Sequence, residues 1–87
     1  MRSIAFVPPA WDEFCYLLET DKAVSQRIRA LLEVMRRTPF EGIGKPEPLK
    51  HERAGTWSRR ITNKHRLVYR VEQEVVWVLQ CQHHYQK

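Results

Sequence analysis

Residues Trp57 to His83, WSRRITNKHRLVYRVEQEVVWVLQCQH, show the clearest strand pattern in this sequence. It holds three runs rich in β-branched and aromatic residues, separated by the polar segments Asn63-Lys64 and Glu72-Gln73-Glu74. Runs of this kind, bounded by turn residues, predict strands joined by tight turns. We therefore expect a three-stranded meander over residues 57–62, 65–71 and 75–83. The third strand is the most apolar, which is typical of a central strand.

The N-terminal half predicts a strand followed by two helices. Residues 3–7 form a short apolar run closed by Pro8-Pro9, and proline suits the first turn of a helix. Apolar residues then recur at helical spacing in two series, with Thr20-Asp21 as an N-cap between them and Thr38-Pro39 as the stop. The apolar faces are Trp11, Phe14, Cys15 and Leu18 in the first helix, and Val24, Ile28, Leu31, Leu32 and Met35 in the second.

These elements predict an α+β fold with two N-terminal helices packed on an antiparallel β-sheet. With 87 residues, the chain has room for a single domain spanning residues 1–87. It contains no run of roughly 18 apolar residues and no secretory leader, so we expect a cytoplasmic protein without a membrane partner. In that reducing compartment, Cys15 and Cys81 are expected to be free thiols in the core.

Positive charge is concentrated in one part of the sequence. The whole chain carries a net charge of +5, yet residues 1–44 hold equal numbers of basic and acidic residues. Residues 45–70 hold eight Lys or Arg against Glu47 and Glu52. A solvated basic face is the ordinary explanation for such residues, but clustering of this kind favours a polyanionic partner such as nucleic acid.

Strand alternation sorts the side chains of the meander onto two faces. Arg60 and Arg66 fall on one face, and if helices cover the other, these arginines converge with His84 on an open surface. Trp57 and Trp77 alternate inward and are expected in the core. Arg59 breaks the pattern, so we expect it at an edge or beside a bulge.

The open face offers the groups that RNA cleavage without a metal requires. The substrate's own 2′-hydroxyl is the nucleophile, so the protein supplies a base, an acid and cations that hold the phosphate. The candidates are Glu47 as base, His84 as acid, and Lys45, Lys50, Arg60 and Arg66 as cations. Taken singly, each has a simpler explanation as a surface residue, and Tyr85 could either pack or stack on a base. Ligand spacing for a structural zinc site is absent, so we expect no metal and no cofactor.

Four segments of this sequence closely resemble the YoeB/Txe toxin family of the RelE superfamily. They are TPFEGIGKPEPLK (38–50), GTWSRRI (55–61), HRLVY (65–69) and CQHHY (81–85). The resemblance runs through nearly the whole chain in unbroken order. Three features depart from the family pattern: His83 stands where Arg or Tyr is common, Asn63-Lys64 replaces an often acidic turn, and Gln86-Lys87 follow Tyr85.

The resemblance implies a microbial-ribonuclease-like fold and a toxin of a type II toxin–antitoxin system that cleaves mRNA in the A site of the 70S ribosome. It implies that Glu47 is the general base and His84 the general acid, and that Arg66 stabilises the phosphate. Lys50 and Arg60 would assist, and Tyr85 would orient the C-terminal part of the site. It also implies a homodimer and a YefM/Phd-type antitoxin whose acidic segment covers the site.

Two other functions fit parts of the sequence. A non-catalytic module that blocks translation by binding RNA or the ribosome would need the basic patch but not Glu47. A DNA-binding regulator acting with its antitoxin is weaker, because the chain has no helix-turn-helix with basic recognition residues.

Overall fold

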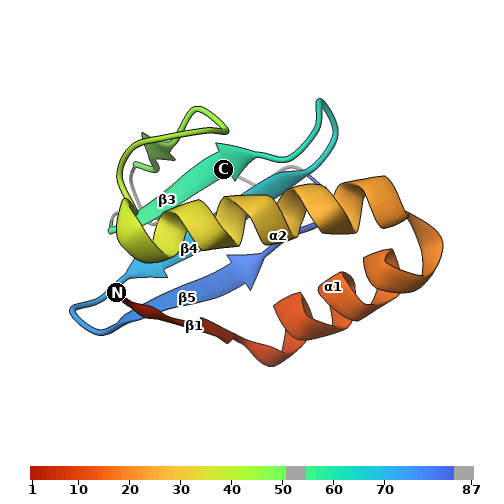
Figure 1. Cartoon of the computed structure of the whole chain (residues 1–87), viewed down its shortest axis with the longest axis horizontal. Coiled ribbons are helices and arrows are strands. Elements are labelled where there is room, and N and C mark those ends of the chain that lie inside the picture. Colours follow the sequence, from red (N-terminus) through yellow and green to blue (C-terminus); the bar gives the residue numbers. More distant parts are fainter. Residues whose placement is uncertain (51–54, 84–87) are drawn as a thin grey trace.

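The order of elements follows the sequence expectation of a strand, two helices and a meander (Figure 1). The structure is a computed structural model that describes residues 1–50 and 55–83. Its elements are β1 (Ser3–Phe6), α1 (Pro8–Thr20), α2 (Lys22–Arg37), β2 (Glu47–Pro48), β3 (Thr56–Arg60), β4 (Arg66–Val71) and β5 (Val75–Gln80). The short strand β2 is an addition to the elements expected from the sequence.

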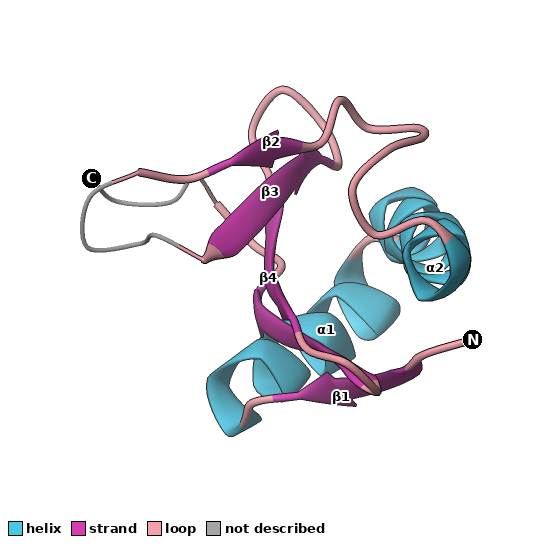
Figure 2. Cartoon of the chain, turned by 90° about the vertical axis from the view of Figure 1, so that its left-hand side faces the viewer, coloured by secondary structure: helices cyan, strands magenta, loops and turns pink. Residues whose placement is uncertain are grey.

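The strands form one five-stranded sheet in the order β1-β5-β4-β3-β2. The pairs β2–β3, β3–β4 and β4–β5 are antiparallel, whereas β1 lies parallel to β5 and makes the sheet mixed. Both helices lie on the same side of this sheet (Figure 2). The predicted arrangement of two helices on a sheet is therefore confirmed, with a parallel edge strand added.

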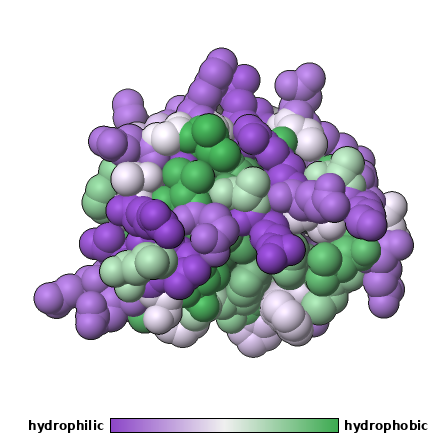
Figure 3. Space-filling model, in the orientation of Figure 1, coloured by the Kyte–Doolittle hydropathy of each residue, from purple (hydrophilic) through white to green (hydrophobic). Residues whose placement is uncertain are grey.

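Helix α1 turns a different face to the core from the one predicted. Ala10 and Leu17 are its buried residues, whereas Trp11 is 50% exposed and Leu18 is 51% exposed. The small Ala10 side chain lets the helix approach the sheet closely, so the larger side chains lie at the flanks. There the Trp11 ring contacts the edge of Phe6 at a centroid distance of 5.6 Å. Hydrophobic side chains reach the surface over α1 and also over the loop that follows α2 (Figure 3).

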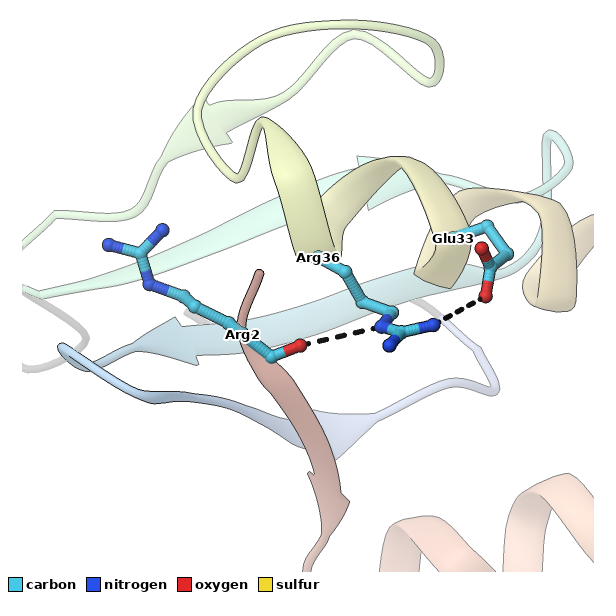
Figure 4. A network of polar contacts seen from close by, with 3 residues as sticks. All are labelled: Arg2, Glu33 and Arg36. Atoms are coloured by element: carbon cyan, nitrogen blue, oxygen red, sulfur yellow. Dashed lines mark hydrogen bonds and ion pairs between the residues drawn. The ribbon is translucent and has the colours of Figure 1, made fainter.

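Helix α2 matches its prediction at both ends. Asp21 Oδ1 accepts a hydrogen bond from Val24 N at 3.2 Å, which caps the helix. The helix ends at Arg37, directly before Thr38-Pro39. Near this end Arg36 Nε donates to the carbonyl of Arg2 and Nη1 contacts Glu33, so the C-terminus of α2 is joined to the start of β1 (Figure 4). Its buried residues include Val24, Ile28, Leu31 and Met35.

Strand β5 contains a bulge that changes which side chains face the helices. Val78 pairs with Tyr69 while Gln80 pairs with Val68, so Leu79 is the extra residue. Strict alternation along the last strand was therefore a wrong prediction, because a bulge moves the residues beyond it to the opposite face. Trp77 was also wrongly assigned to the core. It pairs with Arg70 on the face away from the helices, and its Nε1 donates to Glu72 Oε1 at 3.1 Å.

Both cysteines are free, and only Cys81 is buried. Its amide donates to Glu13 Oε1 at 2.9 Å and its thiol contacts the carbonyl of Ala10. Burial, followed by the nearby Glu13 carboxylate, raises the pKa of the Cys81 thiol to about 12. Cys15 is half-buried, so the core expectation holds for Cys81 alone.

Within the described ranges, no helix combines the length and apolar content needed to cross a membrane.

Candidate active site

Arg59 holds the loop after α2 against the sheet. Its side chain is fully buried. The guanidinium donates to the carbonyls of Thr38 (2.7 Å), Glu41 (2.9 Å) and Ile43 (2.9 Å), and Nε donates to Tyr69 Oη (3.1 Å). The prediction of an edge or bulge position was wrong, because three carbonyls and a hydroxyl replace water around the charge. Arg59 thereby fixes the path of the chain toward Lys45 and Glu47.

Gly44 joins the loop after α2 to strand β3. Its carbonyl accepts from Arg60 N at 2.7 Å, and its φ is +88°. A Cβ atom at this position would lie 2.8 Å from Leu31 Cδ2, so only glycine fits between α2 and β3 without a shift. The next residue, Lys45, also has a positive φ of 52°. The chain then enters β2, where Glu47 pairs with Ser58.

The sheet face away from the helices collects three of the predicted residues, Glu47, Arg60 and Arg66. Register places Arg60 directly opposite Arg66, and Glu47 in one row with Ser58 and Val68. Directly opposed residues have Cβ atoms about 5 Å apart, and strands two positions apart are separated by roughly 10 Å. The expectation that Arg60 and Arg66 share one sheet face is confirmed, while their roles stay predictions.

The Arg66 guanidinium is oriented by the β3–β4 turn. Its Nη1 donates to the carbonyl of Thr62 at 2.6 Å and to that of His65 at 3.2 Å. Within the described residues, the side-chain hydrogen bonds of Arg66 all come from Nη1. One edge of the guanidinium is therefore fixed, which preorganises the half-buried cation for an anionic ligand.

The two lysines lie at opposite ends of β2. Lys45 precedes the strand, next to Gly44, whose carbonyl accepts from Arg60 N. Lys50 is exposed and follows Leu49, whose amide donates to Thr56. The structure thus brings Lys45 toward the arginine pair and leaves Lys50 at the far end of the same strand.

The chain leading to the predicted acid is held beside Arg66. Arg66 N donates to the carbonyl of His83 at 2.9 Å. His84 and Tyr85 lie outside the described residues. Among the residues that are described, the face presents cations and the Glu47 carboxylate, a set that can bind an anion and accept a proton. No group of three or more potential metal ligands occurs in this described part.

The sequence interpretation missed His65. This residue is 8% exposed, and its Nδ1 accepts from His83 N at 2.8 Å. Burial is the largest cause that lowers the pKa of His65, and Lys64 and His83 add to it; Asp21 and Glu13 act in the opposite direction. A histidine directly before Arg66 at the start of a strand was the available signal.

Comparisons with known proteins agree over nearly the whole chain. A family model described as the YoeB-like toxin of bacterial type II toxin–antitoxin systems matches residues 6–85. Toxin YoeB of Escherichia coli K12 is 53% identical over 76 residues, which cover 87% of this chain and 90% of that protein.

Solved structures give the same result for the fold. The YoeB–YefM complex from Staphylococcus aureus matches with a TM-score of 0.89 and 38% identity, covering 98% of this chain and 99% of that one. A YoeB dimer from the same species matches with a TM-score of 0.90 and 40% identity, covering 97% and 98%. This chain therefore belongs to the family of YoeB-like toxins of bacterial type II toxin–antitoxin systems.

Proposed function

We propose that this toxin is an endoribonuclease that cleaves mRNA in the A site of the ribosome and so inhibits translation in the cytoplasm. One observation carries the proposal: the Arg60–Arg66 pair and the Glu47 strand share the sheet face that no described helix covers. Cations beside a carboxylate are what a phosphodiester needs for binding and for loss of a 2′-proton.

In the proposed reaction Glu47 takes the proton from the 2′-hydroxyl. The O2′–P bond then forms while the P–O5′ bond breaks, and His84 gives a proton to the departing O5′. Arg66 and Arg60 neutralise charge on the phosphate, Lys45 and Lys50 hold the flanking backbone, and Tyr85 orients the C-terminal part of the site. All the groups in this scheme are side chains of the protein, and it uses no cofactor.

The partners follow from the same proposal. The substrate is mRNA bound to the 70S ribosome. The solved relatives are described as a YoeB–YefM complex and a YoeB dimer. By analogy, a YefM/Phd-type antitoxin neutralises this toxin by covering its basic face, and the free toxin forms a homodimer.

Substitution of the two proton-transfer residues tests the activity. We expect Glu47→Gln and His84→Gln each to lower the rate of mRNA cleavage by roughly 10²–10⁴-fold, because each removes one proton-transfer group. The measurement is primer extension on mRNA translated by purified ribosomes. Glu19→Gln, an exposed position on α1, is the matched control and should cleave as the unsubstituted protein does.

The same assay separates cleavage from simple occupancy. Discrete cuts phased with codons support the nuclease. Inhibition of translation without cuts, or full cleavage by both Glu47→Gln and His84→Gln, would contradict the mechanism. Inhibition without cuts would instead indicate a module that acts by binding the ribosome.

A further inference from the structure

The turn that leads to the C-terminus is held by three neighbouring residues. His83 N donates to His65 Nδ1 at 2.8 Å, and the carbonyl of His83 accepts from Arg66 N at 2.9 Å. Gln80 Nε2 also donates to that carbonyl, at 3.0 Å, and to the carbonyl of Gln82 at 3.0 Å. Both polar groups of the His83 backbone are therefore bound, and the direction of the chain at this residue is fixed.

The His83 backbone adopts a conformation that needs such support. Its φ is +67°, in the left-handed region that side-chain-bearing residues rarely occupy. A backbone of this kind persists only where surrounding contacts determine it, and it recurs near functional sites. Among the described residues, His65 supplies the one side-chain contact to the His83 amide, from a buried position directly before β4.

The contact specifies the chemical state of His65. An amide can donate only to an imidazole nitrogen that carries no proton, so Nδ1 is unprotonated and Nε2 carries the ring hydrogen. The surrounding groups favour this neutral ring: burial, Lys64 and His83 lower its pKa more than Asp21 and Glu13 raise it.

We propose that His65 is a positioning residue, which fixes the backbone at His83 through its amide and thereby supports proton transfer by the residue proposed as the acid, His84. This inference rests on the proposed nuclease function. His65 does not touch substrate in this scheme. It acts on the residue that precedes the acid, and a displacement of about 1 Å in a reacting group can cost about 10²-fold in rate.

Two substitutions separate positioning from filling of space. In His65→Asn, Oδ1 is bonded to Cγ as Nδ1 is, so an acceptor stays at the same distance along the side chain. In His65→Gln the side chain is longer and the acceptor moves one bond further out. We expect His65→Gln to lower the cleavage rate at saturating ribosomes by up to about 10²-fold with half-saturation unchanged, and His65→Asn to keep most of the activity.

Each result of this comparison decides the matter. Equal, full activity of both variants overturns the proposal, as does an equal loss in both. If His65→Gln does not fold, two measurements on the unsubstituted protein test the proposal instead. Its ring ¹⁵N shifts should show an unprotonated Nδ1 at neutral pH, and cleavage should fall as that nitrogen is protonated. A protonated Nδ1 at neutral pH, or full cleavage with the ring protonated, overturns the proposal.

Measuring His84→Gln alongside separates a failure of the nuclease mechanism from a failure of the positioning role. If His84→Gln cleaves normally, the proposed acid fails and the role of His65 fails with it. If His84→Gln is inactive while His65→Gln retains full activity, the nuclease mechanism stands and the positioning role alone is wrong.

Discussion

At the scale of single residues, Arg59 shows how a charge can be buried without an acidic partner. In the described part of the chain, no carboxylate contacts its guanidinium; the partners are the carbonyls of a single loop and the hydroxyl of Tyr69. Tyr69 Oη in turn donates to the carbonyl of Pro39 at 2.7 Å. The loop and the charge therefore satisfy each other, and neither can be changed alone.

Removal of this charge should destabilise the whole domain. Arg59→Met leaves three loop carbonyls without their donor, so we expect a loss of about 3–5 kcal/mol in the free energy of unfolding. Urea denaturation measures the effect. Arg70→Met, an exposed arginine on β4, should change that free energy by less than about 0.5 kcal/mol. A similar small change for Arg59→Met would contradict the structural role.

His65 is a second single residue with a measurable effect, because it makes the free energy of unfolding depend on pH. Its pKa is lower in the folded protein than the ordinary 6.5, chiefly through burial, so the unfolded chain binds the proton more readily. The stabilisation is fully present above pH 6.5 and decreases as the pH falls through the lowered folded value. Urea denaturation of the unsubstituted protein and His65→Asn across this window tests it, because the asparagine variant should lose this part of the pH dependence.

At the scale of elements, the sequence predicted the helices and strands but not all of their faces. The meander, the α2 cap at Asp21 and the stop before Pro39 followed from local patterns. The face of α1 did not, because the packing of Ala10 against the sheet is a tertiary effect that outweighs the size of Trp11 and Leu18. The β5 bulge likewise has no local signal, since Leu79 continues an apolar run.

In the candidate site, too, some residues were placed correctly from the sequence and others were not. Alternation was enough to place Arg60 and Arg66 on one face, since each strand keeps its register with its neighbour. Arg59 and His65 were beyond such reasoning, because their partners are backbone groups distant in sequence, at Thr38 and His83. Residue chemistry offered Glu47 as base and His84 as acid, and the resemblance to a family implied the same two roles, which stay predictions.

In the loop between α2 and β2, Gly44 is required both by its backbone conformation and by the close approach of neighbouring atoms. Gly44 and Gly55 both have a φ of +88°, but an added Cβ meets Leu31, Arg59 and Arg60 at Gly44 and nothing within 4 Å at Gly55. Gly55→Ala should cost roughly 1–2 kcal/mol from backbone strain alone. Gly44→Ala should cost about 1–3 kcal/mol more through overpacking. Urea denaturation of both variants measures the difference, and equal losses would show that the close approach is unimportant.

Over the molecule as a whole, the excess positive charge belongs to one part of the sequence. Residues 1–44, which include both helices, hold equal numbers of basic and acidic residues, whereas residues 45–70, which include β2, β3 and most of β4, hold eight basic residues against two acidic ones. A surface of this kind binds a phosphate backbone mainly by releasing counterions, so affinity must fall steeply with salt.

Salt dependence therefore tests which cations contact RNA. With cleavage blocked by Glu47→Gln, the slope of log affinity against log salt for single-stranded RNA should fall in magnitude by about 0.7 when Arg60→Gln is added. Adding Arg37→Gln instead, at an exposed position at the end of α2, should leave the slope unchanged. Fluorescence anisotropy over a salt series gives both slopes, and equal slopes for the two variants would remove Arg60 from the interface.

The parallel pairing of β1 with β5 determines when the sheet can form during synthesis of the chain. β1 is translated first, but it can pair only after β5 has been translated. In the sheet order, β5 lies between β1 and β4 and pairs with both. A nascent chain that lacks β5 exposes two unpaired strand edges and cannot close its sheet. The sheet can therefore close only after β5 has been translated.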